Sequence, residues 1–201
     1  DTDIDSWCWS FSATVKTAAG LDLCKPVSAT PVKVIATING YFWHILVDGY
    51  SERGSFGNSA YTITGRTIAV ELASPMAEPA SKVYDNVGGI LLSQVFDQEL
   101  LRVQGEYEPD WTGVWNAQDG LIPPNTFTYQ DKTPIEVITT LAAAVGAFVH
   151  HDPVSRTLYV DKRYKTNPWD FTQGVEDMAL DHSSVISTGM AWKPTPEKNG
   201  V

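Results

Sequence analysis

Hydrophobic and polar residues alternate along much of the first third of the chain. From Trp7 to Val15 every odd position is apolar or aromatic, and the even positions carry Cys, Ser or Thr. This period of two predicts a strand with one buried face. The same alternation occurs over Val32–Ile38 and Tyr41–Val47, which are separated by Asn39-Gly40. Because Asn and Gly both accept positive φ, these residues predict a tight β-hairpin.

The segments around these strands are less regular. Leu21–Pro31 contains two prolines and is predicted to be a loop, and Ser51–Ser59 is predicted to be a loop or tight turn. Ala60–Thr64 is expected to form a short strand. The residues after it, Arg66–Ala73, are expected to form a short helix that ends at Ser74-Pro75, since a residue before proline avoids helical geometry.

Two helices are predicted in the middle of the chain, after a loop over Met76–Tyr84. Val87–Val103 carries apolar residues at helical spacing, although two glycines weaken its first turn. Thr133–Val145 has the stronger signal. Its N-cap threonine, a proline at the first helical position and Glu136 form a capping box, and Gly146 occupies the usual glycine position after the last turn.

Strands are expected again near the C-terminal end. Leu121–Tyr129 is predicted to be a loop followed by a short strand. Ala147–His151 and Thr157–Asp161 flank a turn at Asp152-Pro153 and predict a second hairpin, and Val185–Trp192 predicts a further strand.

Together these elements predict an α+β fold with barrel- or sandwich-like sheets and two principal helices. The composition shifts near Pro75, which predicts a β-rich domain over residues 1–75 and a mixed α+β domain over 76–201. The chain stops one residue after Asn199-Gly200, a hairpin-turn signal, so we expect the native polypeptide to continue.

The composition argues against some classes of function. The chain is 43% hydrophobic and 19% charged, as in folded proteins. No apolar run reaches the roughly 18 to 20 residues needed to cross a bilayer, so no membrane insertion is expected. The net charge is −10 and the Lys and Arg residues are scattered, which argues against specific nucleic-acid binding. Cys8 and Cys24 could form a disulfide, but free thiols are the favoured interpretation.

The ionisable residues give no enzyme signature. In His150-His151-Asp152 the two histidines would point to opposite faces of a strand and could not easily hold one metal. Carboxylate pairs such as Glu106/Glu108 and Glu176/Asp177 favour solvated acidic loops over a glycosidase pair. His182, Asp181 and the stretch Gly54–Gly57 complete no known metal, serine-nucleophile or phosphate motif. We therefore expect no catalytic residue, no metal and no cofactor.

The chain contains seven tryptophans. Trp7, Trp9 and Trp43 share alternating positions with aliphatic residues, which favours core packing. Trp111 and Trp115 are expected in a loop, where they could contribute to a subunit or partner interface. For Arg66, capping a local structure and pairing across an interface are equally open.

Several motifs follow one another in a characteristic order along the chain. The first half contains Asp5–Thr14, Ala36–Gly40 with Trp43, Arg53 with Ser55–Gly57, and Thr62–Arg66. The second half contains Leu121–Pro123, Thr133–Gly146, Tyr159 with Arg163-Tyr164, and Pro168–Asp170. These ordered motifs resemble tail proteins of siphophages and Mu-like prophages, in particular the baseplate or tail-tip hub family. The resemblance covers about Asp5 to Phe171 and departs from the family pattern over Arg102–Asp119.

This resemblance implies a non-enzymatic structural subunit. It would connect the tail tube to distal tail and tip or fibre proteins, act as a homotrimer in the full-length protein, and reside in the virion tail after synthesis in the host cytoplasm. The alternative is a carbohydrate-binding or host-recognition module of a tail tip, which would expose a row of tryptophans.

Overall fold

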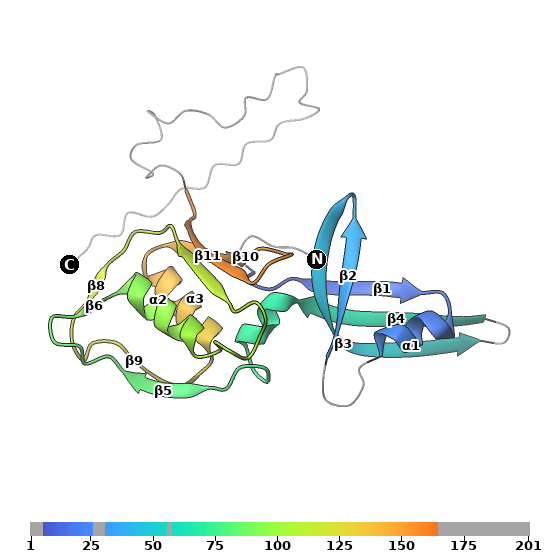
Figure 1. Ribbon diagram of the computed structural model, residues 1–201, viewed down its shortest axis with the longest axis horizontal. Coiled ribbons are helices and arrows are strands. Elements are labelled where there is room, and N and C mark those ends of the chain that lie inside the picture. The colour runs from blue at the N-terminus through green and yellow to red at the C-terminus, as the bar shows by residue number, and fades with distance from the viewer. Residues whose placement is uncertain (1–5, 26–30, 56–57, 165–201) are drawn as a thin grey trace, which may run out of the picture. The chain divides into compact units, whose positions relative to one another are not determined.

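A computed structural model describes residues 6–25, 31–55 and 58–164 (Figure 1). All of the helices and strands described lie in one unit, Asp1–Arg163, and Tyr164–Val201 form a separate unit. The strand predicted over Val185–Trp192 and the turn at Asn199-Gly200 lie outside the described residues. Among the described residues, no helix combines the length and hydrophobicity needed to span a bilayer.

The N-terminal half forms a four-stranded antiparallel sheet in the order β1-β4-β3-β2. Its elements are β1 (Ser10–Val15), α1 (Ala18–Cys24), β2 (Val32–Ile38), β3 (Tyr41–Ser55) and β4 (Asn58–Thr67). The predicted hairpin is confirmed: Asn39 and Gly40 have φ of 53° and 85°, and Ile38 pairs with Tyr41. The alternation in β1 is also confirmed, because its odd positions are partly buried and its even positions exposed.

Two predicted loops in this half are wrong. Ser51–Ser59 mostly extends β3 and β4, with Glu52 opposite Tyr61 and Arg53 opposite Ala60. Leu21–Pro31 was predicted to be a loop, but its first residues belong to α1. This helix begins after Thr17, whose hydroxyl accepts a hydrogen bond from the backbone N–H of Gly20 at 3.1 Å. Leu21 is its one buried residue, so the helix carries almost no periodic signal.

Gly65 allows β3 and β4 to approach closely. A Cβ atom at this position would lie 2.4 Å from the carbonyl oxygen of Leu46, a backbone atom that cannot rotate away. We therefore expect Gly65→Ala to lower the free energy of unfolding by about 1 to 3 kcal/mol in urea denaturation. Gly49→Ala is the control, because its Cβ would meet only the Thr64 hydroxyl at 3.4 Å. Equal effects of the two substitutions would contradict this account.

The short helix predicted over Arg66–Ala73 is partly wrong. Arg66 and Thr67 still belong to β4, and the helix is a 3-10 turn, η1 (Ile68–Leu72), whose five residues are all buried. The four apolar residues of η1 pack in one hydrophobic cluster with residues of α2 and α3. The chain therefore passes from the sheet directly into the core of the second half, and the domain boundary near Pro75 stays a prediction.

Within the described residues, the second half contains three small sheets and two longer helices. β10 pairs antiparallel with β11 and β11 parallel with β7, while β5 pairs with β9 and β6 with β8. The elements are β5 (Ala80–Val83), β6 (Ile90–Leu91), α2 (Leu92–Leu101), β7 (Thr112–Trp115), β8 (Leu121–Ile122), β9 (Thr128–Lys132), α3 (Pro134–Ala144), β10 (Ala147–His151) and β11 (Thr157–Lys162). Strand β5 lies within Met76–Tyr84, so the prediction of a loop over these residues is wrong.

Helix α3 and the hairpin after it are confirmed. The Glu136 carboxylate accepts hydrogen bonds from the backbone N–H and hydroxyl of Thr133 at 2.8 and 3.0 Å, and these contacts, with Lys132, lower the pKa of Glu136. Gly146 has φ of 65°, as expected after a helix end. Helix α2 is shorter than the predicted Val87–Val103, because its first residues form a glycine turn and then strand β6.

The fold is α+β, as predicted, but its sheets are open. Within the described residues no sheet closes into a barrel, and the helices include the short α1 beside the two principal ones, α2 and α3. Barrel-like closure is therefore the part of the fold prediction that the structure corrects.

Candidate interaction site

The tryptophan-rich segment before β1 ties the N-terminal sheet to the second half. His151 is 1% exposed, and its Nδ1–H donates to the Trp7 carbonyl oxygen at 3.0 Å. Its ring lies 4.8 Å from that of Trp9, which packs edge-on against Trp43 at 5.3 Å. Trp9 also exchanges two hydrogen bonds with Thr67, one with its hydroxyl and one with its N–H. These contacts agree with the predicted packing role of the three tryptophans, each of which is partly buried.

The charge state of His151 follows from this packing. Burial lowers its pKa to about 4, although the hydrogen bond to Trp7 opposes the shift. The imidazole is therefore neutral at pH 7. Because a carbonyl oxygen can only accept, the proton lies on Nδ1.

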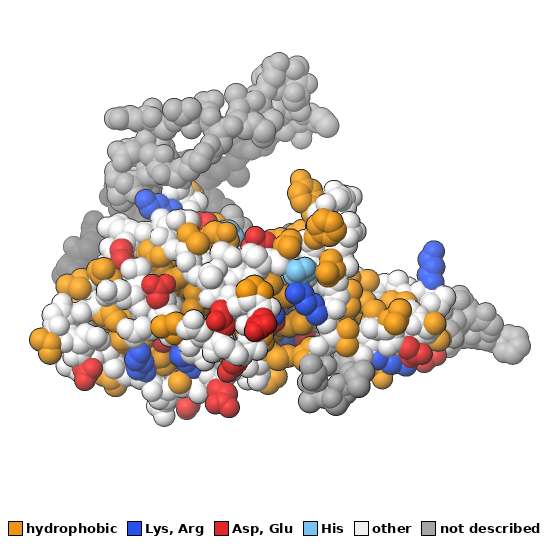
Figure 2. Space-filling view, viewed as in Figure 1, with side chains coloured by type: hydrophobic (Ala, Val, Ile, Leu, Met, Phe, Trp, Pro, Cys, Tyr) orange, Lys and Arg blue, Asp and Glu red, His pale blue; other side chains and the backbone are white. Residues whose placement is uncertain are grey.

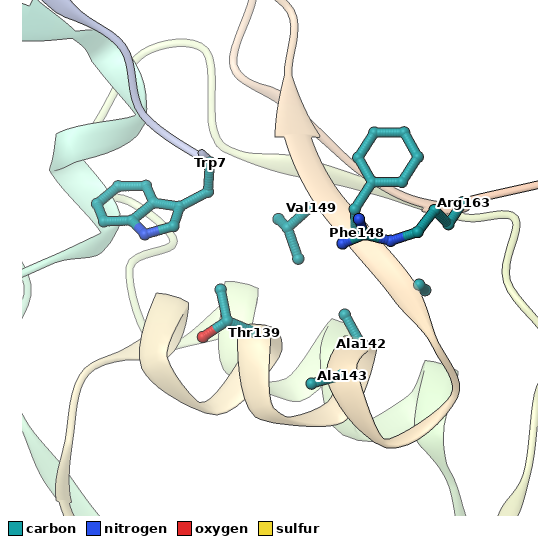
Figure 3. Close-up of a pocket in the computed structure, with 8 residues that line it drawn as sticks. Trp7, Thr139, Ala142, Ala143, Phe148, Val149 and Arg163 are labelled. Atoms are coloured by element: carbon teal, nitrogen blue, oxygen red, sulfur yellow. The ribbon is translucent and has the colours of Figure 1, made fainter. Parts of the chain in front are cut away.

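A pocket of about 180 Å³ lies beside Trp7 (Figure 3). Helix α3 forms one wall and β10 another, with Thr139 and Val149 facing each other. Arg163 alone is charged among the described residues that line it. The lining residues are Trp7, Thr139, Ala142, Ala143, Ala147, Phe148, Val149 and Arg163.

Trp9, two residues further along, lines a second and smaller pocket. It measures about 100 Å³ and opens on the apolar face of the N-terminal sheet. Its walls are Trp9, Ser10, Phe11, Ile38, Trp43, Ile45 and Thr67. Both pockets are therefore built around the same N-terminal segment.

The end of the β2–β3 hairpin exposes large hydrophobic side chains (Figure 2). Tyr41 is 72% exposed, Phe42 53% and Ile38 48%. The ten residues Val34–Trp43 contain no charged side chain, in a chain with a net charge of −10. Contiguous exposed apolar surface of this kind is typical of protein–protein contact sites. We call Ile38, Tyr41 and Phe42 the hairpin tip.

The three predicted interface residues lie in different settings. Trp111 is 6% exposed and donates its indole N–H to the Glu71 carboxylate at 3.1 Å. Trp115 is partly buried at the end of β7, with its ring 5.7 Å from Phe96, so the loop predicted for it is wrong. Arg66 lies in β4 and forms a two-point ion pair with Asp48 on β3, at 2.6 and 3.3 Å. This pairing raises the pKa of Arg66, although burial opposes the shift. An interface role for the three stays a prediction.

Of the other candidate residues, the two adjacent histidines have local partners. His150 and His151 point to opposite faces, as predicted: His150 Nε2 lies 2.6 Å from an Asp161 oxygen, whereas His151 is buried. No group of three or more His, Cys, Asp or Glu among the described residues could hold a metal ion. Glu106 and Glu108 are exposed, and Glu176, Asp177, Asp181 and His182 lie outside the described part. Cys8 and Cys24 are free thiols.

Comparisons with known proteins give similarity at the level of the fold. No family model and no curated protein matches the sequence. The chain is similar to the tail protein from Neisseria meningitidis MC58, with a TM-score of 0.52 and 15% identity over 76% of this chain and 41% of that one. It is also similar to the 43 kDa tail protein of prophage MuSo2 from Shewanella oneidensis, with a TM-score of 0.46 and 15% identity over 80% of this chain and 46% of that one. The chain thus has a tail-protein-like fold and spans less than half the length of either protein.

Proposed function

We propose that this chain is a non-enzymatic structural subunit of a phage tail, located in the baseplate or tail-tip hub and joining the tail tube to distal tail and tip proteins. The observation that carries the proposal is the fold shared with the Neisseria tail protein, at a TM-score of 0.52 over 76% of the chain. The resemblance of motifs such as Thr62–Arg66 to the hub family supports a location in the baseplate or tail-tip hub.

The surface chemistry supports a role based on subunit contacts. Within the described residues, β1 and β2 are the two edges of the N-terminal sheet, and edge strands offer unpaired backbone groups to a neighbour. The hairpin tip adjoins the β2 edge and exposes the apolar surface that such a contact would bury. Assembly as a homotrimer is the arrangement we propose.

Immunogold electron microscopy tests the location. Antibody raised against these 201 residues would be applied to intact and to disrupted phage tails. We expect label confined to the distal end of the tail in at least one preparation. Absence of label on both, with the antigen detectable in the lysate, would contradict a structural role in the virion.

The hairpin tip provides a test of assembly. We expect Tyr41→Ser combined with Phe42→Ser to weaken self-association of the full-length protein by tenfold or more, because each buried aromatic anchor contributes on the order of 1 to 2 kcal/mol. Sedimentation equilibrium would measure the trimer dissociation constant. Val87→Ser is the matched control, since Val87 is also an exposed hydrophobic residue but lies outside the hairpin. A full-length protein that stays monomeric at high concentration would contradict the trimer.

A further inference from the structure

The pocket beside Trp7 has the size and lining to receive one aromatic side chain. Its volume of about 180 Å³ is comparable to the roughly 150 Å³ apolar cavity of another protein that binds benzene. Most of its described lining residues are threonine, alanine or valine from α3 and β10, and the Trp7 indole lies on one side (Figure 3). The Thr139 hydroxyl already donates to the Ile135 carbonyl oxygen at 2.9 Å, so its methyl group suits an apolar occupant.

The charged residue at this pocket favours an occupant that carries a negative charge as well as an apolar group. Of the described lining residues only Arg163 is charged, in a chain that carries an excess of ten negative charges. A guanidinium group offers a planar pair of donors that matches a carboxylate. An occupant that combines an aromatic ring with a carboxylate would therefore complement both the walls and the charge.

We propose that this pocket binds the C-terminal residue of a partner polypeptide, with a phenylalanine-type side chain in the pocket and the terminal carboxylate on Arg163. In a C-terminal residue, the ring and the carboxylate belong to the same amino acid. Both contacts then form without ordering further residues, which keeps the entropic cost of binding low. The inference rests on the pocket itself and goes beyond the proposed function.

Binding can be measured on the isolated chain by titration in ¹H–¹⁵N NMR, with the Trp7 indole N–H and the Val149 amide as reporters. The probes are N-acetylglycylphenylalanine, its C-terminal amide, and N-acetylglycylglycine. We expect the two phenylalanine probes to bind saturably, the acid about two- to fivefold more tightly than the amide, as for a partly exposed ion pair. The probe without a ring should not bind. No shift of either reporter at millimolar probe would overturn the proposal.

Two variants localise the two contacts. Ala143→Leu should fill the pocket and abolish binding of both phenylalanine probes, whereas Ala144→Leu, at the next exposed position of α3 but outside the lining, should leave binding unchanged. Arg163→Gln should make the acid and the amide bind equally. Binding that survives Ala143→Leu would overturn the site, and a preference for the acid that survives Arg163→Gln would overturn the role of Arg163.

A fourth probe tests whether the ring and the carboxylate must belong to a C-terminal residue. The peptide N-acetyl-Gly-Phe-Asp-Gly-amide places a ring and a carboxylate on adjacent internal residues. We expect it to bind no better than the phenylalanine amide, and binding as tight as that of the free acid would overturn the C-terminal assignment. Because these measurements use the isolated chain, their outcome is independent of where immunogold label appears on the tail.

Discussion

Replacing Glu71 by alanine should destabilise the protein by about 3 to 5 kcal/mol, the range for removing one partner of a buried ion pair. Glu71 is 3% exposed and lies in the 3-10 turn η1. Both of its carboxylate oxygens accept from Arg156, at 2.6 and 2.9 Å, and one also accepts from Trp111. The substitution would leave a nearly buried guanidinium without its carboxylate partner and an indole N–H without its acceptor.

The cost is large because this carboxylate joins three segments that are distant in sequence. Arg156 comes from the turn between β10 and β11, and it also donates to the carbonyl oxygen of Glu108 at 2.7 Å. The Tyr107 ring lies 5.1 Å from the same guanidinium. The contact between Arg156 and Glu71 raises the pKa of Arg156, although burial opposes the shift. A guanidinium stays protonated even without such a contact, so removing Glu71 would leave its charge uncompensated.

Chemical denaturation of wild type and variant would measure the loss. The matched control is Asp48→Ala, which breaks another two-point pair with arginine, but one whose side chains are 33% and 41% exposed. For that exposed pair we expect about 0 to 1 kcal/mol. Glu71→Gln should lie between the two, because it keeps an acceptor but loses the charge. Equal losses for Glu71→Ala and Asp48→Ala would show that burial does not determine the effect.

The elements that could be predicted from sequence are those fixed by local chemistry. Asn39-Gly40 defines its own turn, and Thr133, Pro134 and Glu136 define the start of α3 without help from the rest of the chain. The opposite orientations of His150 and His151 follow from the period of a strand alone. In each case the determining contacts lie within a few residues.

The elements that could not be predicted depend on distant residues. Ser51–Ser59 has the glycines and charged residues typical of a loop. Most of it nevertheless forms strand, because the end of β3 and the start of β4 pair with each other. Trp111 lies two residues after Pro109 and directly before a glycine-containing strand, and the carboxylate that accepts from its indole N–H belongs to Glu71, 40 residues upstream. A glutamate within the apolar run Ile68–Leu72 does signal a buried partner, but not that the partner is Arg156, 85 residues away.

The pocket beside Trp7 was missed for the same reason. Its walls come from residues between Trp7 and Arg163, and alanines at helix positions such as Ala142 and Ala143 are expected in any packed helix. The shape of a pocket depends on which side chains are too small to fill the space between elements, and this is fixed only once the elements are placed.

Folding stability should fall as the pH is lowered from about 6.5 to about 4, and His151 should account for roughly 3 kcal/mol of the fall. Burial lowers the pKa of its imidazole to about 4 in the folded chain, whereas the ordinary value of 6.5 holds after unfolding. Between these values the unfolded chain binds a proton that the folded chain does not. Stability from this residue is therefore complete above pH 6.5 and is lost progressively down to pH 4.

The contribution of His151 can be separated by comparing wild type with His151→Gln in urea at several pH values between 4 and 7. Glutamine is neutral throughout and retains an N–H donor for the Trp7 carbonyl oxygen, so the variant should be less dependent on pH and the difference from wild type should shrink as the pH falls. His44 is the control, because burial also lowers its pKa but it is less enclosed, so His44→Gln should change the pH dependence less. A constant difference between wild type and His151→Gln across this range would contradict this account, because it would mean that the imidazole has the same pKa in the folded and in the unfolded chain.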